Sequence, residues 1–178
     1  MFVLLIIEGI FILTMAKYST KSSPASGVKA RGFFRLQIAE DNKVVGDSGW
    51  KENTVVNLGF DQYLCQTLAG MAGSKTVSHA AIGTGTAPGV TDTTLNGEIA
   101  DASNMRCAVT PTTIASKTVQ FAFTLNSNII TAAKTIQNVG LFNTSATTTG
   151  TIFAGNTYAT SALATNQIIQ GSYQIRFA

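Results

Sequence analysis

The sequence predicts a mainly β protein, an antiparallel β-sandwich of jelly-roll-like type with one amphipathic helix near residues 57–69. Three observations support this prediction. Several segments alternate apolar and polar residues with a period of two, most regularly over residues 119–125 and 169–177. Only 12% of the residues are charged, so Thr, Ser and Asn supply the neutral polarity that suits strands and turns. A helical spacing of apolar residues follows the third expected strand.

Composition divides the 178 residues into an N-terminal part, residues 1–30, and a single β-sandwich domain, residues 31–178. Residues 16–30 are typical of a flexible basic arm. Residues 1–14 form an apolar segment with three open interpretations: a membrane or signal segment, a start assigned too early, or a segment that packs on the domain. No basic residue precedes the apolar run, and a membrane span needs about 20 apolar residues, so the first interpretation fits poorly.

The first half of the domain is expected to contain three strands and the helix. The strands cover residues 32–40, a short return at 44–45, and residues 50–56. Asn57 is the expected N-cap of the helix. The expected buried face of the helix carries Phe60, Leu64 and Leu68, and the expected closing glycine is Gly70 or Gly73.

Residues 76–98 organise the prediction, because helix lies before them and strands follow them. A strand over 76–82 breaks at residues 83–86, where two glycines permit unusual backbone angles. A Pro-Gly turn at 88–89 and a Thr-rich crossing lead to residues 95–98. A dinucleotide-binding loop needs a third glycine and a following helix, so residues 83–89 are predicted to be a structural turn.

The second half is expected to consist of strands and turns. Strands are predicted over 105–110, 118–125, 136–142, 151–158 and 168–177, with turns or loops at 111–116, 144–150 and 161–166. The strand over 136–142 carries apolar residues on both sides, which predicts that both of its faces are covered. The residues expected to be buried in the sandwich are Leu36, Ile38, Phe121, Phe123, Tyr173 and Ile175.

The chemistry-bearing residues are few and scattered, so no catalytic, cofactor-binding or metal-binding residue is predicted, and the protein is not expected to be an enzyme. The single histidine, His79, lies in an expected strand without a Cys or Asp beside it. The two cysteines, Cys65 and Cys107, suit buried free thiols better than a disulfide, although spacing leaves the disulfide open. The carboxylates are Glu8, Glu40, Asp41, Asp47, Glu52, Asp61, Asp92, Glu98 and Asp101, mostly in expected turns or caps.

Charge is concentrated near the N-terminus of a chain whose net charge is +3. The early basic residues are Lys17, Lys21, Lys29, Arg31 and Arg35. They lack the density and interleaved aromatics of a nucleic-acid site, so neither nucleic acid nor a small-molecule substrate is expected as a ligand. No Asp or Glu follows Asp101. Such depletion of charge favours a surface that packs against partners, including copies of the same chain.

Five short motifs bear a resemblance to a known group of proteins. They are NTVVNLGF at 53–60, IGTGTAP at 82–88, TLNGE at 94–98, IQNVGLFN at 136–143 and YQIRF at 173–177. Over residues 31–178 their order resembles virion structural proteins of tailed bacteriophages. The resemblance implies a structural particle component with no active site, located in the virion. It also implies a homo-oligomer, most simply a trimer, bound to other virion proteins of the capsid or tail.

Three functions are compatible with these observations. The first is a capsid decoration or cement subunit of a bacteriophage virion. The second is an adhesin-like binding module on a tail or fibre. The third is a secreted or membrane-tethered bacterial β domain. Low charge and one helix within a β chain do not separate them.

Overall fold

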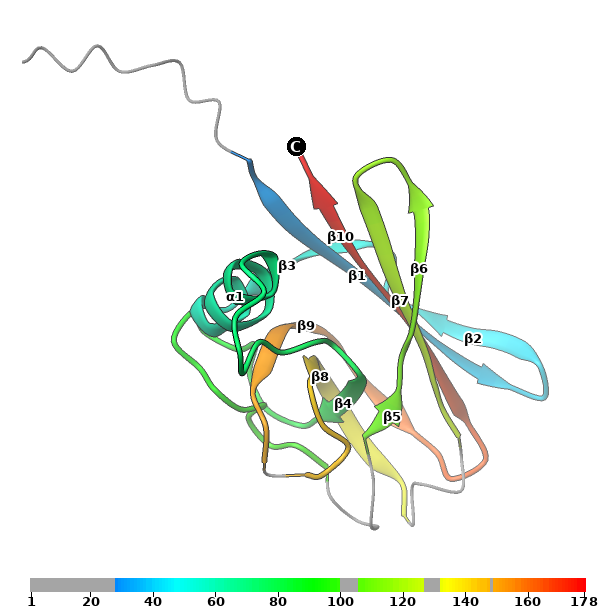
Figure 1. The fold of residues 1–178 in the computed structure, drawn as a ribbon. Helices are drawn as coiled ribbons and strands as arrows, with labels where there is room; N and C mark the ends of the chain where they lie inside the picture. The colour runs from blue at the N-terminus through cyan, green and yellow to red at the C-terminus, as the bar shows by residue number, and fades with distance from the viewer. Residues whose placement is uncertain (1–27, 100–105, 127–131, 148) are drawn as a thin grey trace, which may run out of the picture.

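The computed structural model describes residues 28–99, 106–126, 132–147 and 149–178. These residues form a mainly β fold in which ten antiparallel strands make one nearly closed, barrel-like sheet (Figure 1). The strands are β1 (Ala30–Glu40), β2 (Lys43–Asp47), β3 (Lys51–Val55), β4 (His79–Gly83), β5 (Cys107–Ala108), β6 (Thr110–Ala115), β7 (Thr118–Leu125), β8 (Lys134–Phe142), β9 (Ile152–Leu163) and β10 (Ile168–Phe177). The helical segment comprises η1 (Gly59–Cys65) and α1 (Gln66–Leu68).

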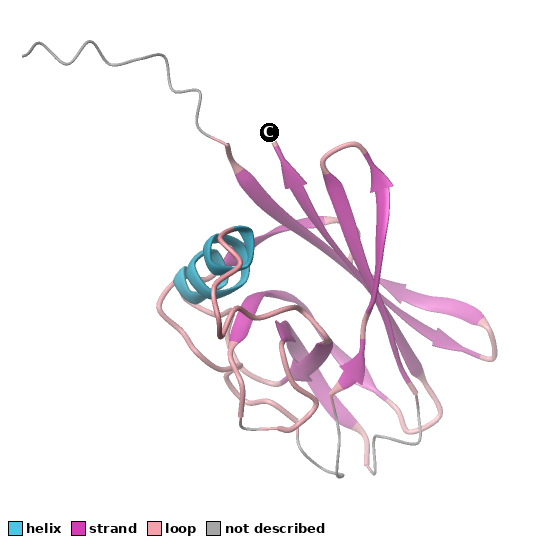
Figure 2. Cartoon of the chain, in the orientation of Figure 1, coloured by secondary structure: helices cyan, strands magenta, loops and turns pink. Residues whose placement is uncertain are grey.

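The strands follow one path, β5-β4-β8-β9-β3-β1-β10-β7-β6, and β2 pairs with β1 beside it. The two ends of the path are adjacent in sequence, because β5 and β6 are separated by Val109 alone. At the opposite corner β3 pairs with β1 through residues 51–53 and with β9 through residues 54–55. The antiparallel β prediction is therefore confirmed, and the strands form one continuous hydrogen-bonded path (Figure 2).

The central pair is β1 with β10, in register from Ala30 opposite Phe177 to Ala39 opposite Ile168. Register places opposite residues on one face of the sheet. Phe34, Tyr173 and Phe121 form one inward row across three strands. Four of the six residues expected in the core are buried: Leu36, Phe123, Tyr173 and Ile175. The prediction was too strong for Ile38 and Phe121, which are half-buried at the edge of the main core.

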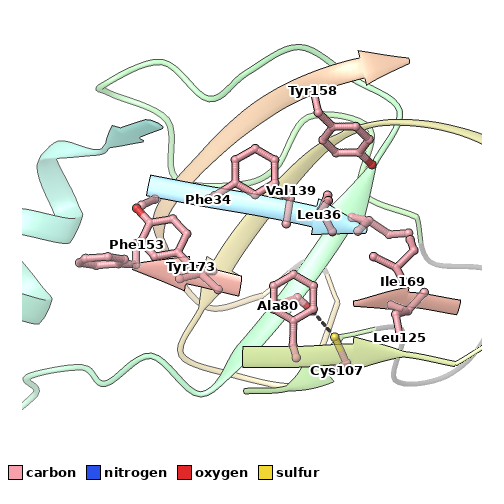
Figure 3. Close-up of a cluster of buried hydrophobic side chains, with 14 of the residues drawn as sticks. Phe34, Leu36, Ala80, Cys107, Leu125, Val139, Phe153, Tyr158, Ile169 and Tyr173 are labelled. Carbon is pink, nitrogen blue, oxygen red and sulfur yellow. Dashed lines mark hydrogen bonds between the residues drawn. The ribbon is translucent and has the colours of Figure 1, made fainter. Parts of the chain in front are cut away.

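Two apolar clusters stabilise the sheet, one on each side of β8. The main cluster fills the barrel, where Phe34 and Phe153 are each 1% exposed (Figure 3). The second cluster comprises Val56, Ala81, Leu95, Phe142 and Ile152. Within β8, Leu141 belongs to the first cluster and Phe142 to the second, so the prediction of a strand covered on both faces is confirmed.

The helix lies where the sequence predicts it, but its orientation differs from the prediction. Its first part is a π-helix, in which the hydrogen bonds run from i to i+5 and the apolar period changes. Gly59 and Tyr63 are the buried positions of η1. The backbone packs so closely at Gly59 that a Cβ there would lie 2.2 Å from the Phe153 carbonyl oxygen. Of the predicted buried face, Leu64 packs against the main cluster, whereas Phe60 is 41% exposed and Leu68 is 91% exposed.

The helix ends as predicted at Gly70, whose φ is +62°. The Gly70 amide donates to the Thr67 carbonyl and the Met71 amide donates to the Gln66 carbonyl, at 3.1 and 2.9 Å. This pair of bonds is the Schellman arrangement, which glycine favours at this position. The expected Asn57 cap is wrong, because the helix begins without a side-chain capping bond.

Several other boundaries differ from prediction. Residues 111–115 belong to β6 rather than to a turn, and Pro111 is tolerated because β6 is an edge strand. β9 continues to Leu163, beyond the predicted end at 158, because it pairs with Lys134–Ile136 of β8. β4 starts at His79 rather than at residue 76. The predictions for residues 1–27, Asp101 and Met105 lie outside the described residues.

Candidate functional site

The loop that follows β4 is a structural element, built by close backbone contact. A Cβ on Gly83 would lie 2.8 Å from the Gly97 carbonyl oxygen, and one on Gly85 would lie 2.3 Å from the Asn96 carbonyl oxygen. The buried Asn138 amide donates to the carbonyls of Thr86 and Asn96, at 2.9 and 2.8 Å. Gly83 and Gly85 are therefore needed for close approach. Neither has the positive φ that the sequence suggested, which instead occurs at Gly97 (+64°).

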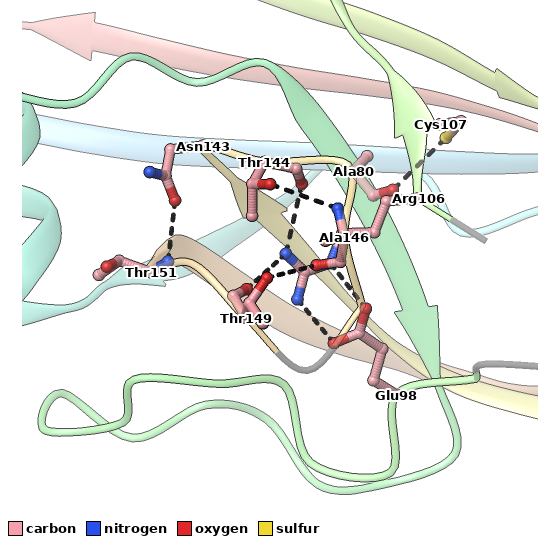
Figure 4. A network of polar contacts seen from close by, with 9 residues as sticks. All are labelled: Ala80, Glu98, Arg106, Cys107, Asn143, Thr144, Ala146, Thr149 and Thr151. Carbon is pink, nitrogen blue, oxygen red and sulfur yellow. Dashed lines mark hydrogen bonds and ion pairs between the residues drawn. The ribbon is translucent and has the colours of Figure 1, made fainter. Parts of the chain in front are cut away.

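The strongest polar constellation is a buried guanidinium that sequence reasoning missed (Figure 4). Arg106 Nε donates to Glu98 Oε1 at 2.7 Å, and its Nη2 donates to Glu98 Oε2 at 2.9 Å. Its Nη1 donates to the Thr149 carbonyl at 2.8 Å and to the Thr144 carbonyl at 3.3 Å. The guanidinium carbon also lies 3.6 Å from the centre of the Phe142 ring.

This constellation is a structural anchor. The Arg106 side chain is 0% exposed and that of Glu98 is 8% exposed, so neither group is accessible to a ligand. The ion pair fixes the end of the loop that follows β4 against the loop between β8 and β9. In the sequence, Arg106 occupies a polar position of an alternating segment, and nothing there indicates that its side chain is covered. Its only signal is the scarcity of charge around it.

The other candidate groups are separate from this pair. His79 Nδ1 lies 2.8 Å from the Ser78 hydroxyl, and burial together with the charge of Arg106 lowers the pKa of His79. The buried Cys107 Sγ lies 3.6 Å from the Ala80 carbonyl oxygen, and burial raises the pKa of its thiol to about 11. Both cysteines are free, as expected, but Cys65 is exposed, contrary to prediction.

The described carboxylates do not converge on a cleft. Glu40 accepts hydrogen bonds from Asn166 and Gln167, which lower its pKa. Asp92 accepts a bond from the Gly89 amide at 2.9 Å and closes the Pro-Gly turn. Across the described ranges, His, Cys, Asp and Glu side chains form no group of three or more that would hold a metal ion. The same part of the chain contains no helix long and apolar enough to cross a membrane.

The feature that best fits a functional surface is the exposed apolar side of the helical segment. We define the helical patch as Phe60, Leu68 and Met71, which are 41%, 91% and 55% exposed. Phe60 lies in η1, Leu68 is the last residue of α1, and Met71 follows in the C-terminal turn, so all three belong to this short segment and its end. Gly59 and Tyr63 are the positions that anchor η1 against the core, and none of the three patch residues is buried.

Comparison with protein-family models, with curated proteins and with solved structures found no match for this chain. The fold and the surface therefore define a mainly antiparallel β protein with an apolar helical patch.

Proposed function

We propose that this protein is a structural component of a bacteriophage virion, most simply a capsid decoration or cement subunit. The single observation that carries the proposal is the helical patch. Large exposed apolar patches mark contact surfaces in soluble proteins, and Phe60, Leu68 and Met71 expose three large apolar side chains within a short stretch of chain. The motif resemblance described above assigns the contact to other virion proteins and to copies of this chain, in a homo-oligomer that we take as a trimer.

The distribution of charge supports the same proposal. No carboxylate follows Asp101 in the sequence, so β6 to β10 carry no acidic side chain that a neighbouring subunit would have to bury unpaired. We also propose that the barrel-like sheet is a jelly-roll-like sandwich of two layers, with β3 and the β5–β6 segment as the corners between the layers.

The proposal is tested by changing the patch without changing the core. Leu68→Asp introduces a charge at a side chain that is 91% exposed, so the isolated domain should keep its melting temperature. The same change should weaken binding to particles that lack this protein by at least tenfold, since a buried unpaired carboxylate is costly at an interface. Binding is measured by co-sedimentation with those particles.

Val90→Asp is the matched control, because it replaces an apolar side chain that is 55% exposed with the same charge, in the loop after β4. Equal binding by wild type, Leu68→Asp and Val90→Asp would contradict the proposed role of the patch. Failure of the wild-type chain to bind any particle would contradict the virion assignment itself.

A further inference from the structure

A groove crosses the outer face of the sheet, on strands that do not carry the helical patch. It has a volume of about 560 Å³ and is bordered by β1, β10, β7, the β5–β6 segment and Trp50. That volume is in the range of small-molecule sites, which is about 300–1,000 Å³. The side chains that matter most for its chemistry are Arg35, Gln37, Trp50, Ala122, Gln170 and Ser172.

The strand register explains why the surface is hollow here. Arg35, Ser172 and Ala122 lie in one row across β1, β10 and β7, and the last two are small. One flanking row carries the longer Gln37 and Gln170. The small side chains of Ser172 and Ala122 therefore form a floor beside the taller Gln37 and Gln170, with Trp50 also bordering the groove.

One wall of the groove is held in place by Asp47. This carboxylate accepts bonds from Arg35 Nε at 3.0 Å and from Gln37 Nε2 at 3.1 Å. It also accepts a bond from the Gly49 amide at 2.9 Å, in the turn that precedes Trp50. The Arg35 guanidinium keeps the pKa of Asp47 well below its usual range, so the network persists at neutral pH. A wall fixed before a ligand arrives reduces the entropic cost of binding.

The lining selects a class of ligand. The charge of Arg35 is balanced by Asp47, so the groove presents no net charge and favours a neutral ligand. The Gln170 amide and the Ser172 hydroxyl make no hydrogen bonds with the described part of the chain, and each supplies both a donor and an acceptor. Trp50 is 41% exposed at the rim and offers a flat apolar surface with one polar edge.

We infer that this groove binds a neutral saccharide, with one sugar ring against the Trp50 indole and its hydroxyl groups hydrogen-bonded to Gln170 and Ser172. Adjacent hydroxyls of a pyranose act as donors and acceptors, which matches the amide and hydroxyl lining. The C–H face of the ring matches the apolar surface of the indole. The inference goes beyond the virion assignment, and its test does not depend on it.

The test uses the full chain and an array of neutral oligosaccharides, two to six residues long, built from glucose, galactose, mannose and N-acetylglucosamine. The best binder is then titrated in solution. Trp50 is the only tryptophan in the chain, so its fluorescence reports directly on contact with the sugar. We expect saturable binding accompanied by a change in that fluorescence.

Two variants locate the site. Trp50→Ala should weaken binding at least tenfold, measured by calorimetry. Ser172→Leu should also weaken binding at least tenfold, because the larger side chain fills the bottom of the groove. This variant keeps Trp50, so the loss of binding can be followed as the loss of the fluorescence change. Val90→Ala is the control, because Val90 is 55% exposed, lies in the loop after β4 and borders neither the groove nor the helical patch, and it should bind like wild type.

Two results would overturn the inference: no binding on the array, or binding that Trp50→Ala and Ser172→Leu leave unchanged. A further contradictory result would be a change of oligomeric state in Ser172→Leu without saccharide binding by wild type. That outcome would make this face a protein interface. Melting temperatures within about 2–3 °C of wild type would show that the variants are folded, because shifts of that size reflect only small changes in stability for a domain of this size.

Discussion

At the scale of single residues, Arg106 joins three parts of the chain through one buried guanidinium. Arg106→Ala would leave Glu98 buried without its partner, and removing one member of a buried pair costs about 3–5 kcal/mol. We therefore expect the free energy of unfolding in urea to fall by that amount.

The exposed pair of Arg31 and Glu52, 3.9 Å apart, supplies the control. Arg31→Ala should change the free energy of unfolding by about 0.5 kcal/mol or less, since exposed pairs contribute little. Similar losses for Arg31→Ala and Arg106→Ala would contradict the anchoring role of the buried pair.

Asp47 predicts how stability depends on acid. Its pKa is lowered by Arg35, so the folded state binds a proton less readily than the unfolded state, where an Asp titrates near about 3.9. The stability that Asp47 contributes is therefore complete above about pH 4 and is lost as the pH falls through its lower folded pKa. Asp47→Asn should be less stable than wild type at pH 6, and the difference in melting temperature should shrink towards pH 2.5. A difference that is constant over this range would contradict the assignment.

At the scale of elements, β7 and β10 are locked together by one aromatic ring. Phe123 is 6% exposed and lies over Gly171, where a Cβ would come within 1.9 Å of the ring. Phe123→Ala should reduce the free energy of unfolding by about 3–5 kcal/mol, because it leaves a cavity in the core. Thr124→Ala, at the exposed neighbouring position, should change it by about 0.5 kcal/mol or less. A loss below about 1 kcal/mol for Phe123→Ala would show that the inward face is misassigned.

The loop after β4 makes a second prediction at this scale. Gly85→Val would add a branched side chain at a position where even a Cβ would lie 2.3 Å from the Asn96 carbonyl oxygen. The Asn96 backbone cannot move away without breaking its hydrogen bond from Asn138. We expect a lower melting temperature. Gly89→Val is the control at the same turn, because a Cβ there meets its nearest atom at 3.8 Å. Saturable nucleotide binding by wild type that Gly85→Val abolishes would instead make this loop a phosphate site.

The elements show which parts of the fold the sequence predicts. Period-two alternation located β1, β7 and β10, because one face of each is buried and the other is not. The alternation placed the start of β9 within one residue but missed residues 159–163, because those residues are held in the strand by pairing with β8, which is distant in sequence. The helix was located, but a π-helical turn and a close approach at Gly59 moved its buried positions to Gly59 and Tyr63, and of the predicted face only Leu64 packs against the core. The burial of Arg106 depends on three loops meeting, which local patterns do not encode.

At the scale of the whole molecule, two different surfaces have two different chemistries. The helical patch is apolar and belongs to the proposed subunit contact. The groove beside Trp50 is polar and neutral. It lies on the outer face of the sheet, on strands that do not carry the helical patch. A subunit held to a particle through the patch would therefore leave the groove available to a ligand.

The central claim is that this chain is a repeated structural subunit of a virion. The most direct test is quantitative mass spectrometry of the tailed-phage particles produced by the genome that encodes this chain. A cryo-EM reconstruction of the same particles follows. The claim predicts that the chain is present in many copies and that the β fold fits symmetry-related density, with the helical patch facing neighbouring protein. Absence of the chain from purified particles, with the capsid and tail proteins present, would contradict the claim.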